Sequence, residues 1–520
     1  MSLGLRQQLY AIFFTVVISG LLSCGSPYNR NHSYASVSYY NIEAGAKLSQ
    51  QFCSQCHQFP DPSLLDAKSW AKGVLPQMGP RLGIEKNGFE TYPSYKNDPY
   101  LKESIYPAKP LLTPVEWQYI IDYYTATSPD SLQQPANTTV NLSDKIFKVV
   151  VPKDLYQNAA TSYIKILDSN NSSRLLVSDA MKNSSYFFDA DLNVTDSFKT
   201  NGPIVDVKLE PNKLLLCNIG VLNPNNGTSG KIETLSLNTK GSKNKLLFQD
   251  LQRPVEVTAA DLNNDGRQDY LVSEFGFITG KLCWMENKVD SFKKHILRPL
   301  PGAIKSYIRD VNNDGLPDIW VLFSQGEEGI FLFTNKGQGK FESSQVLRFP
   351  PSYGSSYFEL ADFDHDGYDD ILYTCGDNAD YSAILKPYHG VYIFLNDKTN
   401  HFKETFFYPI NGCYKAMAKD FDGDGDLDLS CISFFPDLAH KPDEGFVYLE
   451  NIGKENFKPY AISGLPQGRW LTMDTGDFDT DGKVDIALGS FNRGPGTQNN
   501  LSTGNKTHSF ILLKNISSHN

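Results

Sequence analysis

The chain has 520 residues, of which 40% are hydrophobic, and a formal net charge of −11. The hydrophobic content is enough for a folded core, and the acidic balance without a basic patch argues against a nucleic-acid-binding role. The length suggests two or more domains or one large repeat array, and the 39 glycines and 29 prolines favour a turn-rich, mostly β chain.

The first residues have the features of an export signal. Arg6 precedes an apolar run, residues 11–22, which is too short to span a bilayer as a mature helix. The run ends in Leu-Leu-Ser-Cys24, which resembles the lipobox of bacterial lipoproteins. The resemblance implies a signal peptide over residues 1–24 and a lipid on Cys24; an ordinary secretory signal is the alternative. We therefore expect an exported protein, lipid-anchored to the cell envelope on its periplasmic face or at the cell surface, with residues 25–40 as a tether.

A Cys-x-x-Cys-His motif follows at Cys53, Cys56 and His57. The alternatives are a thioredoxin-like redox pair, a zinc site and an iron–sulfur cluster. Zinc needs further ligands nearby, and an iron–sulfur cluster needs further cysteines, whereas the next cysteine is Cys217. Export and the immediate histidine favour covalent attachment of haem c through both thiols, with His57 as one axial ligand of the iron.

The predicted sixth ligand of the haem iron is Met78. It lies in LPQMGPRLG between Pro76 and Pro80, which restrict the segment on both sides, and no other methionine lies between His57 and Met181. Thioether ligation raises the reduction potential of a haem. A methionine that fills a core gap and an iron with an open position are the alternatives.

The sequence around the motif predicts a small helical domain over residues 41–128. Residues 41–52 are expected to form a helix that leads into the motif. Thr113-Pro-Val-Glu116 is a capping box that opens a second helix with an apolar face. A leading and a trailing helix around such a motif resemble the class I cytochrome c fold. Residues 129–144 are predicted to be a linker.

Five later segments share the pattern D-x-[DN]-x-D-G-x-x-D, starting at residues 261, 310, 362, 420 and 477. Oxygen ligands at positions 1, 3, 5 and 9 of a tight loop suit Ca²⁺, and Gly at position 6 permits the turn. We therefore expect about five Ca²⁺ ions; acidic turns without metal are the alternative. The expected ligands are Asp261, Asn263, Asp265, Asp269, Asp310, Asn312, Asp314, Asp318, Asp362, Asp364, Asp366, Asp370, Asp420, Asp422, Asp424, Asp428, Asp477, Asp479, Asp481 and Asp485.

A longer unit recurs around each loop, and it predicts four strands, as in a propeller blade. Two further units without the metal pattern, residues 167–180 and 205–220, bring the total to seven blades. The last unit lacks its fourth strand, and residues 147–152 are expected to supply it and so to close the ring. The repeats resemble the FG-GAP/VCBS repeats of integrin-α-like propellers, which implies a seven-bladed β-propeller with calcium loops over residues 145–517.

Five cysteines remain for the propeller, and they cannot all pair with one another. Cys375 and Cys413 are expected at the same end of neighbouring blades, where either a disulfide or two buried free thiols would fit. The sequence does not choose between these two arrangements.

The whole chain therefore resembles bacterial lipoproteins that join a cytochrome c domain to such a propeller. This implies a membrane-anchored electron-transfer protein whose propeller binds a redox partner protein or an extracellular ligand. The alternatives are a dehydrogenase whose propeller passes electrons to the haem, and an adhesion or glycan-binding module. Because fold does not determine function, the sequence leaves the alternatives open.

Overall fold

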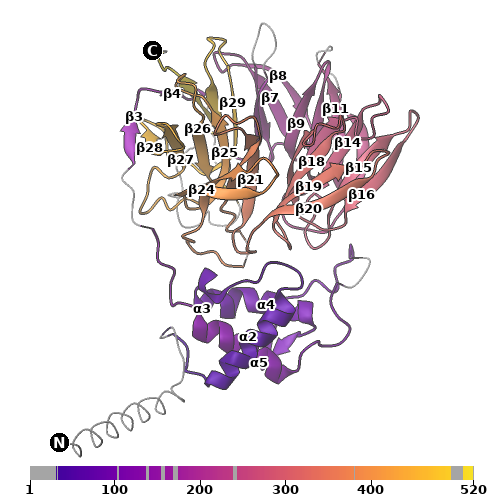
Figure 1. Cartoon of the computed structure of the whole chain (residues 1–520). Helices are drawn as coiled ribbons and strands as arrows, with labels where there is room; N and C mark the ends of the chain where they lie inside the picture. Colours follow the sequence, from indigo (N-terminus) through magenta and orange to yellow (C-terminus); the bar gives the residue numbers. More distant parts are fainter. Residues whose placement is uncertain are drawn as a thin grey trace, which may run out of the picture. The chain divides into compact units, whose positions relative to one another are not determined.

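The computed structural model describes residues 31, 33–101, 105–135, 140–153, 159–167, 174–237, 243–379, 381–493 and 508–518. The chain divides into two compact units (Figure 1). The first comprises Met1–Gln55, Phe59–Asn97 and Lys102–Gln133, and the second Cys56–Gln58, Asp98–Leu101 and Gln134–Asn520. No helix in the described part of the chain is long and apolar enough to cross a membrane. The predicted signal peptide, including Cys24, lies outside the described residues.

Two helices, α2 (Tyr39–Cys53) and α5 (Pro114–Thr127), form the centre of the first unit. The predicted capping box is present at the start of α5. The backbone N–H of Glu116 donates to Oγ1 of Thr113 at 3.2 Å, and the Thr113 N–H donates to the Glu116 carboxylate at 2.7 Å. These bonds satisfy two of the free N–H groups at the helix start and so fix where α5 begins.

The two helices touch at Gly45 of α2. A Cβ atom at this position would lie 2.0 Å from the carbonyl oxygen of Tyr119 and 2.7 Å from Cβ of Tyr123, so a side chain here would force the helices apart. The apolar face predicted for α5 is buried as expected at Trp117, Ile120 and Tyr124. Both predicted helices are therefore confirmed, and they pack against each other.

The segment between the helices consists of short turns: η1 (Pro62–Leu64), α3 (Ala67–Ser69), the π turn η2 (Trp70–Val74), α4 (Leu75–Met78) and η3 (Gly79–Leu82). Buried side chains attach it to α5, because the hydroxyl of Tyr124 donates to the carbonyl of Pro60 at 2.9 Å. The expectation of an all-α unit needs a correction. Two strands, β1 (Lys86–Asn87) and β2 (Glu90–Thr91), form a small antiparallel pair.

The second unit contains seven sheets, each built mainly from consecutive strands (Figure 1). The first two are β5 (Thr161–Leu167), β6 (Arg174–Asp179), β7 (Ser184–Phe188) and β8 (Val194–Lys199), then β9 (Ile204–Glu210), β10 (Lys213–Asn218), β11 (Gly230–Ser236) and β12 (Lys245–Leu251). The next two are β13 (Pro254–Ala260), β14 (Asp269–Glu274), β15 (Lys281–Asn287) and β16 (Phe292–Arg298), then β17 (Ala303–Arg309), β18 (Asp318–Phe323), β19 (Gly329–Asn335) and β20 (Phe341–Arg348).

The remaining three sheets follow the same order. They contain β21 (Ser355–Ala361), β22 (Asp370–Cys375), β23 (Gly390–Asn396) and β24 (Phe402–Pro409), then β25 (Cys413–Lys419), β26 (Asp428–Ser433), β27 (Phe446–Asn451) and β28 (Phe457–Ile462), and finally β29 (Trp470–Gly476), β30 (Asp485–Ser490) and β31 (Phe510–Asn515). The unit is therefore the predicted seven-bladed β-propeller.

The ring closes as predicted. Strand β4 (Phe147–Val150) pairs antiparallel with β31 and supplies the missing fourth strand of the last blade. A strand that the sequence did not predict, β3 (Asn141–Ser143), pairs parallel with β28 and lies in the segment expected to be a linker. Joining the start of the propeller to its last blade removes the open edge that an unclosed ring would leave.

The core lies between neighbouring blades. In the five blades that carry an acidic loop, every residue of the second strand is buried. The apolar residue at loop position 2 contributes to this core: Leu262, Phe363, Phe421 and Phe478 are buried, whereas Val311 is half-buried. Burial of this side chain fixes the loop backbone on which the acidic residues are mounted.

The cysteines of the propeller are buried free thiols. The thiol of Cys375 donates to the carbonyl of Tyr388 at 3.3 Å, and Cys413 is fully buried. Cys375 and Cys413 are therefore two buried free thiols and do not form the disulfide that the sequence also allowed. All seven cysteines in the described part of the chain are unpaired with one another.

Candidate functional site

The acidic loops join the first strand of a blade to the second. In three of them the carboxylates of positions 1, 3 and 9 converge, with one oxygen from each residue within 4.8 Å of the others. These triads are Asp362, Asp364 and Asp370; Asp420, Asp422 and Asp428; and Asp477, Asp479 and Asp485. The two loops that start at residues 261 and 310 have Asn at position 3, so they bring fewer carboxylates together.

The Asp at position 9 is the most constrained ligand. In the third loop, Asp370 accepts the backbone N–H of Phe363 at 2.8 Å with one oxygen and that of Asn396 at 2.8 Å with the other. The same two bonds occur in the other loops at Asp269, Asp318, Asp428 and Asp485. Position 9 thus ties the loop start to the end of the third strand.

This geometry explains why the third strand ends in Asn in each of the five blades that carry an acidic loop. Asn396 donates its backbone N–H to Asp370 and its side-chain amide to the carbonyl of Asp369 at 3.0 Å. The equivalent residues are Asn287, Asn335, Asn451 and Asn515. These residues position the loops, and their regular recurrence before the fourth strand is the signal that identifies them.

The turn itself depends on two left-handed residues, at positions 4 and 6. In the third loop these are His365 (φ 57°) and Gly367 (φ 88°). The Asp362 carboxylate accepts the backbone N–H groups of Asp366 at 3.0 Å and Gly367 at 2.9 Å. The sequence predicted the requirement at Gly367 but not the one at position 4, because Asn, His, Gly and Thr all occupy that position.

The Asp at position 5 has a separate contact within the loop. Asp366 accepts the backbone N–H of Tyr368 at 3.0 Å, and position 5 is outside all three converging triads. The same bond occurs at the other position-5 residues, Asp265, Asp314, Asp424 and Asp481. These carboxylates therefore stabilise the turn in the structure as described.

The triads gather several carboxylates in a partly buried place. Burial, and then the neighbouring Asp residues, raise the pKa of Asp370 and of Asp485 to about 6 and the pKa of Asp428 to about 7. A bound divalent cation would reverse this effect, because it stabilises the ionised form. The oxygen donors and their convergence suit Ca²⁺.

The fifth loop differs from the others because a lysine reaches its triad. The ammonium of Lys514 forms an ion pair with Asp479 and lies 3.8 Å from Asp481. In the fourth loop, by contrast, the hydroxyl of Tyr448 donates to Asp428 at 2.7 Å and no ion pair reaches the triad among the described residues. The loops are therefore unequal as candidate metal sites.

The Cys-x-x-Cys-His motif lies at the end of α2. Cys53 is the last residue of the helix and is half-buried, and Cys56 is exposed. Nδ1 of His57 lies 2.9 Å from the carbonyl oxygen of Gln58. A ring that donates from Nδ1 to a backbone carbonyl has its Nε2 lone pair available to a metal.

Met78 ends α4 and is half-buried. Pro76 lies in the first turn of α4 and Pro80 in the first turn of η3, so the prolines begin helical turns and do not stiffen an extended loop as the sequence suggested. Two thiols, an imidazole and a thioether are the donor types that haem c uses.

A third group of chemically active side chains lies on the first strands of the blades, and the sequence analysis missed it. These strands contact one another in a closed ring, from β5 through β9, β13, β17, β21, β25 and β29 back to β5. Propellers leave a channel at this axis. We call the following charged and tyrosine residues, at alternate positions of these strands, the channel belt: Tyr163, Lys165, Asp206, Lys208, Glu256, Lys305, Tyr307, Tyr357, Glu359, Lys415 and Asp474.

Belt residues contact one another around much of the ring. Lys305 lies 2.6 Å from Glu256, which also accepts from the hydroxyl of Ser306 at 2.6 Å and lies 3.5 Å from Lys208. Further along, Lys165 lies 3.7 Å from Asp474. The signal in the sequence is the alternation of charged or tyrosine residues with apolar ones on each first strand, as in IVDVKLE and AIKSYIR.

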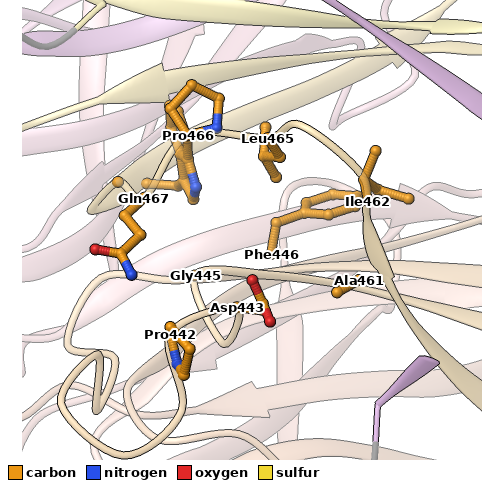
Figure 2. A pocket seen from close by; sticks show the side chains of 11 residues that line it. Pro442, Asp443, Gly445, Phe446, Ala461, Ile462, Leu465, Pro466 and Gln467 are labelled. Carbon is orange, nitrogen blue, oxygen red and sulfur yellow. The ribbon is translucent and has the colours of Figure 1, made fainter. Parts of the chain in front are cut away.

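A hollow at the junction of β27, β28 and β29 contributes no comparable chemistry (Figure 2). Its walls are mainly apolar side chains and backbone, including Phe446, Ile462 and Trp470, and Asp443 is its one charged residue. We therefore assign it no role.

The fold and its loops define the chain's second unit as a seven-bladed β-propeller with FG-GAP-type repeats. Residues 310–373 match the family described as FG-GAP-like repeat. This segment contains the second and third acidic loops and the strands that follow them.

Among known proteins, the chain is 35% identical to integrin alpha-PS5 of Drosophila melanogaster over 103 residues, covering 17% of this chain and 9% of that protein. It is 29% identical to cartilage acidic protein 1 of Mus musculus over 178 residues, covering 32% and 26%. The chain thus spans about a quarter or less of the length of these relatives. Among solved structures, a streptogramin B lyase aligns at a TM-score of 0.45 and 13% identity, covering 71% of this chain and 98% of that one. At this TM-score the likeness carries no argument.

Proposed function

We propose that this protein is an exported, lipid-anchored c-type cytochrome with one haem, which transfers electrons, and whose calcium-stabilised propeller is a docking or ligand-binding platform. Cys53 and Cys56 would hold the haem through thioethers, and His57 and Met78 would ligate its iron. The haem, when bound, supplies a one-electron redox centre.

The observation that carries this proposal is the orientation of His57. The hydrogen bond from Nδ1 to the carbonyl of Gln58 leaves Nε2 for the iron, and the two preceding cysteines form no disulfide. The packing of α2 against α5 through Gly45 holds the segment in place from one side. A second support is the bond from the Tyr124 hydroxyl to Pro60, three residues after His57.

The platform role is supported by the triads and by the relatives. Three converging carboxylate triads in a closed propeller are suited to Ca²⁺, which would hold neighbouring parts of a blade together. Propellers of this repeat type occur in proteins similar to integrin alpha chains. The partner would be a redox protein or an extracellular ligand.

The test is expression of the full chain in a host that matures c-type cytochromes. We expect a Soret band that survives denaturation and acid extraction, because thioethers are covalent, and its loss in a Cys53→Ala/Cys56→Ala variant. Met78→Ala should keep the covalent haem but change the spectrum of the oxidised protein. Wild-type protein that matures without any covalent haem would overturn the proposal.

The channel belt favours a second candidate, a dehydrogenase whose propeller oxidises a substrate and passes electrons to the haem. Its titratable groups converge on the propeller axis as an active site requires. Reduction of the haem by added sugars or alcohols, with no other protein present, would establish this function. Reduction only by small-molecule or protein electron donors would favour the carrier.

A further inference from the structure

We propose that Lys415 is a nucleophilic amine in the propeller channel, which captures small aldehydes or ketones as a Schiff base. The site lies in the channel belt and is independent of whether the chain carries haem. Lys415 lies on β25 and is half-buried.

Lys415 differs from the other three belt lysines because it has no carboxylate partner. Lys165, Lys208 and Lys305 each lie within 4.0 Å of an Asp or Glu, and Lys415 has no such neighbour among the described residues. Its ammonium donates instead to the carbonyl oxygen of Met473 at 2.7 Å. It also lies 4.9 Å from the ring centre of Tyr357.

The groups that face this amine come from all the neighbouring strands. Asp474 of β29 and Glu359 of β21 are acidic, whereas Lys305 of β17 and Lys165 of β5 are cationic. Burial is the largest effect on Lys415 and lowers its pKa to about 8; Asp474 opposes this and Lys305 adds to it. A substantial fraction of the amine is therefore neutral near pH 8, as a nucleophile must be.

The wall beside the amine offers groups for the proton transfers. Burial raises the pKa of Glu359, and the hydroxyls of Tyr307 and Tyr357 lie 3.2 Å apart. A raised pKa favours the protonated form of Glu359, which can donate a proton to a departing hydroxyl.

The chemistry needs no oxidant or reductant. The neutral amine attacks the carbonyl carbon, so the N–C bond forms and the carbonyl π electrons move to oxygen, which takes a proton. The resulting carbinolamine loses the amine proton and its protonated hydroxyl as water, leaving a C=N bond. One carbonyl compound and one amine therefore yield one imine and one water.

The test traps the imine. Full-length protein is incubated with acetaldehyde at limiting concentration and sodium cyanoborohydride, which reduces imines to stable ethylamines, and the modified lysines are identified by peptide mass spectrometry. We expect Lys415 to be modified at least tenfold faster than the surface lysines at pH 7. The rate should rise with pH and level off above about pH 8.

Lys458 is the matched control, because its ammonium lies 5.0 Å from the ring centre of Tyr460 but its side chain is exposed on β28. Lys458→Arg should leave trapping unchanged, and Lys415→Arg should abolish the fast modification. The Lys415→Arg protein must show the wild-type melting temperature, so that lost modification is not caused by unfolding. The modification rates of Lys415 and Lys458 are also compared within the wild-type protein, which needs no variant. Equal rates at the two lysines would overturn the proposal.

Discussion

The acidic loops and the channel belt both hold carboxylates in the propeller, but the chain treats their charge in opposite ways. In the fourth loop, burial raises the pKa of Asp428 to about 7, and nearby Asp residues add to the effect. In the channel, burial also raises the pKa of Glu256, but Lys305 and Lys208 outweigh it, so the pKa is lowered. Burial therefore accompanies a raised carboxyl pKa in the loop and a lowered one in the channel.

The difference lies in where the counter-charge comes from. The channel contains its own counter-charge, because four lysines alternate with four acidic residues along the first strands. Two of the loop triads have no ion pair within the described residues, so a cation that neutralised them would come from solution. The propeller should therefore depend on calcium at its loops and not at its axis.

The largest expected effect is that of removing calcium. Chelation with EDTA should lower the melting temperature strongly, since each bound ion stabilises the folded state by about 2.7 kcal/mol when free Ca²⁺ is 100 times its dissociation constant. Differential scanning calorimetry with and without EDTA measures this. Excess Ca²⁺ should restore the melting temperature. A protein that contains no calcium and melts identically in EDTA would contradict the comparison.

The channel should respond to loss of its own cation. Lys305→Met leaves Glu256 buried with only Lys208 and Ser306 as partners, and we expect a loss of roughly 3 kcal/mol in the free energy of unfolding. Urea denaturation measures it. The double variant Lys305→Met/Glu256→Met should recover most of the loss. If Lys305→Met caused no loss of unfolding free energy in EDTA, the stability of the channel would depend on calcium as well.

The third effect is on the pH dependence of the calcium-free protein. The raised pKa values of Asp370, Asp428 and Asp485 mean that the folded state binds protons more tightly than the unfolded one, so stability is highest at low pH. Each of the three groups should contribute a fall of roughly 2 kcal/mol or more as the pH rises from about 4 to 7. With calcium bound the carboxylates stay ionised, and this fall should be absent. Thermal melts in EDTA at several pH values test it; a rise in stability over this range would contradict it.

The smallest effect concerns the fifth loop. Because the Lys514 ammonium competes with a metal ion for Asp479, Lys514→Met should tighten calcium binding there by about fivefold, or ~1 kcal/mol. Isothermal titration calorimetry measures the calcium affinity of the weakest site, which we expect to be the fifth loop. Lys398→Met is the control, since Lys398 pairs with Asp366 at position 5, outside its triad. An equal gain in both variants would show that net charge alone matters.

Local patterns made much of the molecule predictable. The capping box at Thr113, the acidic nine-residue loops and the closing strand from Phe147 were all readable, because each depends on residues close in sequence or on a repeat period. The small strands β1 and β2, and the parallel pairing of β3 with β28, were not. Those pairings depend on distant chain segments or on two-residue strands that leave no periodicity.

The sequence by itself determined the seven blades, their closure and the composition of each loop, since those features repeat within a unit of fewer than sixty residues. Only the tertiary structure decided that positions 1, 3 and 9 converge while position 5 does not, because that depends on how Asn396 and its equivalents hold the loop. It alone assembled the channel belt, whose members Lys165 and Asp474 are distant in sequence. Closing the ring brings such residues into contact, and no local pattern records which strands will face one another across an axis.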